Sequence, residues 1–166
     1  MKVTRKTIST FITILAVLIL VAAIPSAVRE EFKTGRVYVS SARFLEELPQ
    51  RLTGPGRFRF ILQPLVAIVL GWRSGLSDAR ARRPPYLYGL LAGGANRTEL
   101  LRSGLAAVRD LIAMAIVLEA VSQLLIYKQV HPGAAVIVGV VVIAVPYIAA
   151  RVLTNRVATL TRRHSD

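Results

Sequence analysis

Four apolar stretches alternate along this chain with segments rich in arginine. A helix of about 20 residues, rising roughly 1.5 Å per residue, crosses a hydrocarbon layer of about 30 Å. The pattern therefore predicts an all-α fold, a multi-pass helical membrane protein in which residues 1–166 form a single membrane domain. The apolar stretches are Ile8–Ile24, Phe58–Trp72, Leu105–Tyr127 and Ala134–Leu153. Including their flanks, we predict four transmembrane helices at approximately 8–28, 58–72, 97–127 and 134–153.

The first two helices each have an alternative. The first apolar stretch is longer than the 7–15 residues of a typical signal-peptide core, which favours an uncleaved helix over a cleaved signal. The second corresponds to only about 22 Å of helix and contains Gln63 and Pro64. Arg59 and Arg73 bracket it. An arginine side chain can lie along apolar surface while its guanidinium group reaches the membrane interface. A full crossing is therefore favoured over a re-entrant or surface segment.

The connections between these helices differ in character. Residues 29–57 are predicted to be an external loop that contains a short amphipathic helix around 37–48, ended by Pro49. Residues 73–96 are predicted to be a cytoplasmic basic loop. His131, Pro132 and Gly133 form a tight connection, so the last two helices should be antiparallel neighbours.

The formal net charge is +13, and in a membrane protein it reports first on orientation. With both the N-terminus and the C-terminus cytoplasmic, thirteen basic residues lie inside and eight outside, leaving Arg109 uncounted at a boundary. The reverse orientation violates the positive-inside rule. We therefore predict a multi-pass protein with both termini on the cytoplasmic side. The basic cluster of Arg80, Arg82 and Arg83 is expected to anchor the topology and attract anionic lipid headgroups. Nucleic acid is not an expected partner.

Ionisable residues within a crossing are costly, so each is a candidate site. Asp110 and Arg151 lie about equally far from the hairpin at Val130 and His131. They are predicted to form a structural ion pair at the ends of the last two helices. The alternatives are two charges that reach water independently, or a titrating functional pair.

Glu119 faces only apolar residues at the matching depth of the last helix. We predict an intramembrane polar cluster in which Gln63 bonds Gln123 and Arg59 reaches Glu119. Four interpretations stay open for this carboxylate: packing within one protomer, pairing with a basic residue of another subunit, a proton or cation relay, or a protonated group that faces lipid.

Small residues suggest where helices pack closely. Ala106, Ala113 and Ala120 recur every seven residues, a spacing that allows close helix contact. Two G-x-x-x-G matches, at 71–75 and 89–93, are weaker predictors, because one straddles a membrane boundary and the other lies in a segment too short to span.

Few residues suggest catalysis or cofactor binding. The chain has no cysteine and two histidines, neither in a metal-binding spacing, so we expect no metal, no cofactor and no enzymatic activity. His131 is expected to be an ordinary loop histidine rather than a haem or pigment ligand.

The segments Arg57–Leu65 and Arg83–Leu87 resemble uncharacterised small bacterial integral membrane proteins of similar length. That resemblance implies a multi-pass protein of the bacterial inner membrane and carries no activity. The expected function is a non-catalytic accessory, assembly or stabilising subunit of a membrane complex, in contact with the lipid bilayer and with other membrane protein subunits or itself. The alternative is a small homo-oligomeric channel or transporter that uses Glu119.

Overall fold

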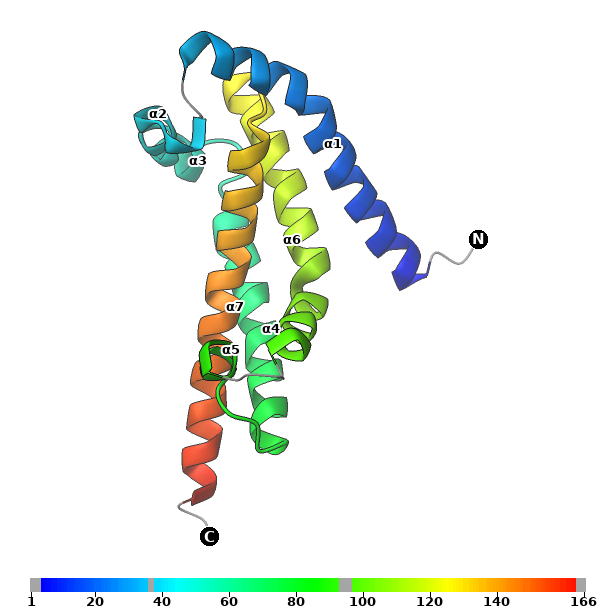
Figure 1. Ribbon diagram of the computed structural model, residues 1–166, viewed down its shortest axis with the longest axis vertical. Coiled ribbons are helices and arrows are strands. Elements are labelled where there is room, and N and C mark those ends of the chain that lie inside the picture. Colours follow the sequence, from blue (N-terminus) through cyan, green and yellow to red (C-terminus); the bar gives the residue numbers. More distant parts are fainter. Residues whose placement is uncertain (1–3, 36–37, 93–96, 164–166) are drawn as a thin grey trace. The chain divides into compact units, whose positions relative to one another are not determined.

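The computed structural model describes residues 4–35, 38–92 and 97–163, and every regular element within them is a helix (Figure 1). The elements are α1 (Arg5–Thr34), η1 (Tyr38–Ser40), α2 (Ala42–Glu46), α3 (Leu48–Thr53), α4 (Arg59–Arg80), α5 (Tyr86–Ala92), α6 (Arg97–Tyr127) and α7 (Pro132–Arg163). The predicted all-helical class is confirmed for this part of the chain.

Three of these helices are long and apolar enough to cross a membrane: α1 over Lys6–Lys33, α4 over Arg59–Arg80 and α7 over Pro132–Thr161. The predicted crossing at Leu105–Tyr127 is helical, within α6, but is not one of the three. That stretch carries the polar side chains of Asp110, Glu119 and Gln123. The part of the chain that the structure describes therefore has three candidate crossings, and the fourth stays a prediction.

Helix lengths differ from the sequence prediction at two places. α4 has 22 residues, about 33 Å, because it continues through the first part of the predicted loop 73–96. Pro64 lies within the helix and does not interrupt it. Pro49 was expected to end a helix around 37–48. Instead it occupies the first turn of α3, where its missing N–H costs nothing.

The chain divides into two compact units, each built from two separate stretches. Unit 1 contains Met1–Ile61 and Asp110–Val141, and unit 2 contains Leu62–Arg109 and Val142–Asp166. The helices α4, α6 and α7 each contribute one part to each unit. The single membrane domain inferred from the sequence stays a prediction.

In unit 1, α1 packs against α6 through a narrow seam (Figure 1). Ala16 of α1 is buried against Ala113 and Val117 of α6. Most other large side chains of α1 are exposed, for example Phe11 and Leu18. The helix ends at Gly35, whose φ of 65° is left-handed and whose N–H binds the carbonyl of Glu31 at 2.8 Å. Small residues thus allow close contact on one side, and the rest of the surface suits lipid.

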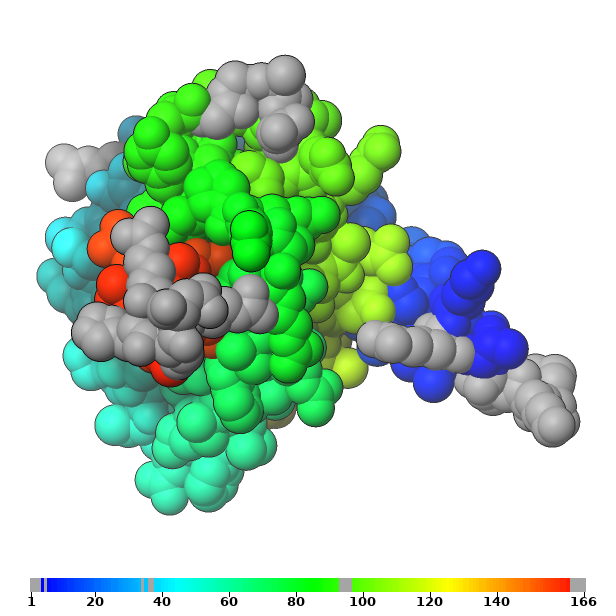
Figure 2. All heavy atoms as spheres, turned by 90° about the horizontal axis from the view of Figure 1, so that it is seen from below, coloured from blue at the N-terminus to red at the C-terminus, as the bar shows by residue number. Residues whose placement is uncertain are grey.

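In unit 2, α4 and α7 pack backbone to backbone. A Cβ at Gly71 would lie 2.3 Å from the carbonyl oxygen of Tyr147, and one at Gly75 would lie 2.4 Å from that of Arg151. The G-x-x-x-G match at 71–75 therefore forms a contact between these helices, although its position at a membrane boundary made it a weak predictor. Figure 2 shows green atoms of unit 2 beside the red end of α7. The Asn155 amide of α7 donates to the carbonyl of Arg83 at 3.3 Å.

Candidate functional site

The carboxylate of Glu119 on α6 is held by three donors in unit 1. Arg51 Nη1 and Gln123 Nε2 both donate to Oε1, the latter at 2.9 Å, and Arg59 Nη2 donates to Oε2 at 2.6 Å. The Glu119 and Arg51 side chains are each 1% exposed and that of Arg59 is 5% exposed. We call Glu119, Arg51, Arg59 and Gln123 the Glu119 clamp. Hydrogen bonds between charged groups that are shielded from water are stronger than hydrogen bonds between neutral groups.

Arg51 comes from α3, outside the three candidate crossings, and its neighbours explain why it tolerates full burial. Its Nη2 donates to the hydroxyl of Tyr38 at 2.7 Å, and its guanidinium lies 5.3 Å from the ring centre of Tyr127 and 5.6 Å from that of Phe44. Burial is the largest single effect and opposes the charge, but the carboxylate of Glu119 together with Tyr38 and Tyr127 outweighs it and raises the pKa of Arg51. The cation is therefore permanent.

A second carboxylate extends the clamp towards the surface. Glu47 lies 3.8 Å from Arg51 and accepts from Arg43 at 2.7 Å and from the hydroxyl of Tyr38. Burial and the bond to Glu47 raise the pKa of Tyr38, so its hydroxyl keeps its proton. Arg43 also pairs with Glu30 at 2.5 Å. Three glutamates thus balance three arginines along one continuous network of charged groups, which links α1, α2, α3, α4 and α6.

Gln123 connects the clamp to the start of α7. Its Oε1 accepts from the backbone N–H of His131 at 2.7 Å while its Nε2 donates to Glu119. That bond satisfies an N–H next to the first turn of α7, where helices leave donors without partners. One turn of α6 therefore positions both the carboxylate and the hairpin that follows.

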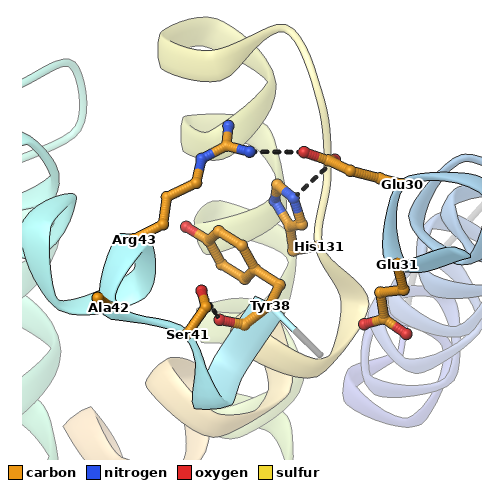
Figure 3. A pocket seen from close by; sticks show the side chains of 7 residues that line it. All are labelled: Glu30, Glu31, Tyr38, Ser41, Ala42, Arg43 and His131. Atoms are coloured by element: carbon orange, nitrogen blue, oxygen red, sulfur yellow. Dashed lines mark hydrogen bonds and ion pairs between the residues drawn. The ribbon is translucent and has the colours of Figure 1, made fainter. Parts of the chain in front are cut away.

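His131 is a buried residue with defined partners (Figure 3). Its ring stacks on Tyr38 with the two centres 3.6 Å apart, and its Nε2 lies 3.2 Å from Oε2 of Glu30. Its Nδ1 has no hydrogen-bond partner among the described residues. This geometry suits the neutral tautomer with the proton on Nε2, and burial lowers the pKa of His131 although Glu30 opposes that effect. His131, Tyr38 and Glu30 line a cavity of about 220 Å³ together with Glu31, Ser41, Ala42 and Arg43.

In unit 2, the partner of Arg151 is Asp78. Nε of Arg151 donates to Oδ2 at 2.6 Å and Nη2 to Oδ1 at 3.1 Å, a bidentate pair with both side chains under 5% exposed. Its Nη1 donates to the Tyr147 hydroxyl at 3.0 Å, and the guanidinium lies 4.0 Å from the centre of the Tyr86 ring. This corrects the predicted pairing of Arg151 with Asp110.

Asp110 lies in unit 1, where its Oδ1 accepts from Ser9 of α1 at 2.6 Å. The predicted pair came from matching residues of the last two helices at equal distances from their connection. That comparison left out α1, which supplies Ser9 to Asp110, and the second half of α4, which supplies Asp78 to Arg151.

The predicted cluster around Glu119 is brought together in part. Arg59, Glu119 and Gln123 meet as expected, and Arg59 contacts Glu119 directly. The Gln123 amide binds Glu119 and the backbone of His131, and its predicted bond to Gln63 stays a prediction. Gln63 belongs to unit 2, and its Nε2 has no hydrogen-bond partner among the described residues.

Arg51, Glu47 and Tyr38 were not predicted as site residues, because all three lie in the predicted external loop 29–57. The i, i+4 spacing of Arg43, Glu47 and Arg51 was the available signal, since it aligns alternating charges on one helical face.

The basic cluster at the end of α4 is largely exposed. Arg80 and Arg82 are exposed, and Arg82 has a left-handed φ of 52° where the helix ends. The Arg83 side chain is 52% exposed, with Nη1 3.9 Å from Asp78. Their predicted contact with lipid headgroups stays a prediction.

No family model, curated protein or solved structure matches this chain. The resemblance to uncharacterised small bacterial membrane proteins stays a prediction.

Proposed function

We propose that this chain is a non-catalytic multi-pass protein of the bacterial inner membrane that acts as an accessory, assembly or stabilising subunit of a larger membrane complex. In this proposal α6 supplies a fourth crossing and both termini are cytoplasmic. Three features support α6 in that role. Its 31 residues are about 46 Å long, its Glu119 is neutralised by arginines, and Asp110 accepts a hydrogen bond from α1.

The observation that carries this proposal is the engagement of Glu119 by two arginines and a glutamine. A relay carboxylate must change its protonation or its partner during each cycle. Glu119 is instead held by two permanent cations in a site that is about 1% exposed. Breaking such a pair costs about 3–5 kcal/mol, which suits a structural anchor better than a transport site.

The clamp fixes the segment from η1 to α3 onto α6, and we call this segment the external cap (residues 38–53). Large apolar side chains on and beside it are exposed: Leu45 at 64%, Leu52 at 54% and, at the end of α1, Phe32 at 86%. A rigid base beneath exposed apolar side chains is the arrangement expected of a protein that works through contacts.

Native mass spectrometry after gentle solubilisation tests this proposal. The protein should be released together with a different membrane protein in a defined ratio. Replacing Leu45 and Leu52 with serine should remove that companion and leave the fold intact. The matched control is Phe11 and Leu18 to serine, exposed on α1 within the apolar stretch.

Two results would contradict the proposal. Release of the chain alone, with no companion under any gentle condition, would remove the case for an accessory subunit. A homo-oligomer whose ion flux in liposomes is abolished by Glu119→Gln would favour the channel or transporter alternative.

A further inference from the structure

A second cavity lies in unit 2, at the end of the apolar stretch of α4. It is open to the surface, has a volume of about 330 Å³ and is lined by Arg73, Ser74, Ser77, Arg83, Ser103 and Arg151, with Asp78 at its base. A water molecule occupies about 30 Å³ of liquid, so the space accommodates a polar group of several heavy atoms.

The charge of this cavity is positive. Asp78 is the one carboxylate in its lining, and both of its oxygens accept from Arg151. Arg83 lies 3.9 Å from the same carboxylate, beyond hydrogen-bond distance. Among the described residues, Arg73 has no ion pair with a carboxylate. The lining therefore has three guanidinium groups, those of Arg73, Arg83 and Arg151, against the single carboxylate of Asp78, a net charge of +2.

Hydroxyl groups supply further donors. Ser74 accepts from the Tyr147 hydroxyl at 3.3 Å, which leaves its own proton available. Ser77 is exposed in the lining, and Ser103 donates its proton to the carbonyl of Leu100 at 2.9 Å. Guanidinium and hydroxyl donors around one space match the oxygens of a phosphate group, which accept several hydrogen bonds at once.

The position of the cavity along α4 indicates which phosphate compound reaches it. Trp72, immediately before Arg73, is 53% exposed and ends the apolar stretch, and tryptophan is enriched at the membrane–water interface. Val69, one turn further into the apolar stretch, is 43% exposed. A phosphate in this cavity would thus lie at headgroup level, with apolar surface available below it for acyl chains.

We propose that this cavity binds the phosphate group of an anionic phospholipid. Arg73 and Arg83 bind the phosphate oxygens, Ser77 donates an additional hydrogen bond, and the Arg151–Asp78 pair forms the fixed base. Of the basic cluster, only Arg83 belongs to this site, whereas the exposed Arg80 and Arg82 attract headgroups only through diffuse charge. This proposal does not depend on the accessory-subunit function.

The test measures lipid retention by native mass spectrometry after reconstitution in nanodiscs of phosphatidylglycerol and phosphatidylcholine mixed equally. The wild type should retain phosphatidylglycerol in preference. Arg80→Gln, the charge-matched control, should weaken retention about fivefold, the effect of about 1 kcal/mol per basic residue at a surface. Arg73→Gln and Arg83→Gln should each weaken it at least about tenfold.

A second pair of variants leaves the net charge unchanged. Ser77→Ala should weaken retention about fivefold through one lost hydrogen bond, whereas Thr98→Ala, exposed at the start of α6, should leave it unaltered. Circular dichroism verifies that each variant is folded, so that retention is compared only between folded proteins. Should Arg73→Gln disrupt folding, Ser77→Ala and Arg83→Gln still decide the question.

Three results would overturn the proposal. Equal losses for Arg73→Gln, Arg83→Gln and Arg80→Gln would reduce the effect to diffuse surface charge. Equal retention of the two lipids by the wild type would remove the anionic preference. Millimolar inorganic phosphate that binds the detergent-solubilised protein in an Arg73-dependent manner, with no lipid retained, would assign the cavity to a soluble anion.

Discussion

Arg51 and Glu119 are 68 positions apart in the chain, yet they form a buried ion pair that joins a short surface helix to a long one. The pair is stable in its buried position only because further charged groups compensate it. Arg59 approaches Glu119 from the start of α4, and Glu47 compensates part of the Arg51 charge. Removing one member leaves the others buried without compensation, and the first prediction follows from that.

Glu119→Gln should destabilise the protein by about 3–5 kcal/mol, because two buried guanidinium groups lose their shared anion. Thermal unfolding in mild detergent, followed by circular dichroism, measures the change. Glu99→Gln, in the exposed first turn of the same helix, is the control and should alter stability by less than about 0.5 kcal/mol. Equal melting temperatures for Glu119→Gln and the wild type would contradict a structural clamp.

A double-mutant cycle of Arg51→Met and Glu119→Gln should give a coupling free energy of at least about 1 kcal/mol, since each single change leaves the other charge unpaired. Chemical denaturation of the wild type, the two single variants and the double variant provides the four free energies. Strict additivity would show that the two side chains act independently.

Replacing Gly71 with alanine should separate α4 from α7. The new Cβ would lie 2.3 Å from the carbonyl oxygen of Tyr147, and a backbone atom cannot move aside as a side chain can. We expect a loss of about 1–3 kcal/mol, measured by thermal unfolding.

Gly89→Ala is the control for that change, because its new Cβ would meet only the end of the flexible Leu100 side chain. Alanine also favours a helix by up to about 1 kcal/mol over glycine. A Gly71→Ala variant as stable as Gly89→Ala would show that the two helices do not need close contact.

The buried His131 should make stability depend on pH. Its pKa is lowered in the folded state, so the unfolded chain binds a proton first as the pH falls through about 6.5. The associated stability is therefore complete above that pH and is lost as the pH falls towards the folded-state pKa. The facing charges of Glu30, Arg43 and Glu47 set the size of the loss.

Melting temperatures of the wild type and His131→Phe between pH 8 and 5 measure this effect. Phenylalanine retains the stacking on Tyr38 but has no proton to bind. The melting temperature of the wild type should therefore fall relative to that of His131→Phe as the pH falls. A wild type that gains stability relative to His131→Phe at low pH would show that Glu30 outweighs burial.

Asp78→Asn should destabilise the protein by about 3–5 kcal/mol, because Asp78 is the bidentate partner of the buried Arg151, whose charge would lose its anion. Chemical denaturation of the variant and the wild type measures the loss. A variant as stable as the wild type would show that Arg151 does not need this carboxylate.

The charged contacts were only partly accessible from the sequence, and for a physical reason. Arg59, Glu119 and Gln123 could be grouped because they lie on long helices whose depth can be counted at 1.5 Å per residue. Arg51 could not, because its place depends on how a loop folds back over the helix ends. Asp78 was missed for a related reason: α4 continues as a helix past Trp72, where loss of apolar character suggested a loop.

Periodicity and composition by themselves determined the helical class and the range of α6. Composition also determined that the chain has no cysteine and only two histidines. The helices follow from local rules, since a long apolar run with few breakers forms a helix whatever surrounds it. Tertiary structure alone decided which charges meet, that Gly71 and Gly75 form a helix contact, and that His131 is buried against Tyr38. Those outcomes depend on side chains brought together from distant positions, where the burial of one charge determines which partner it requires.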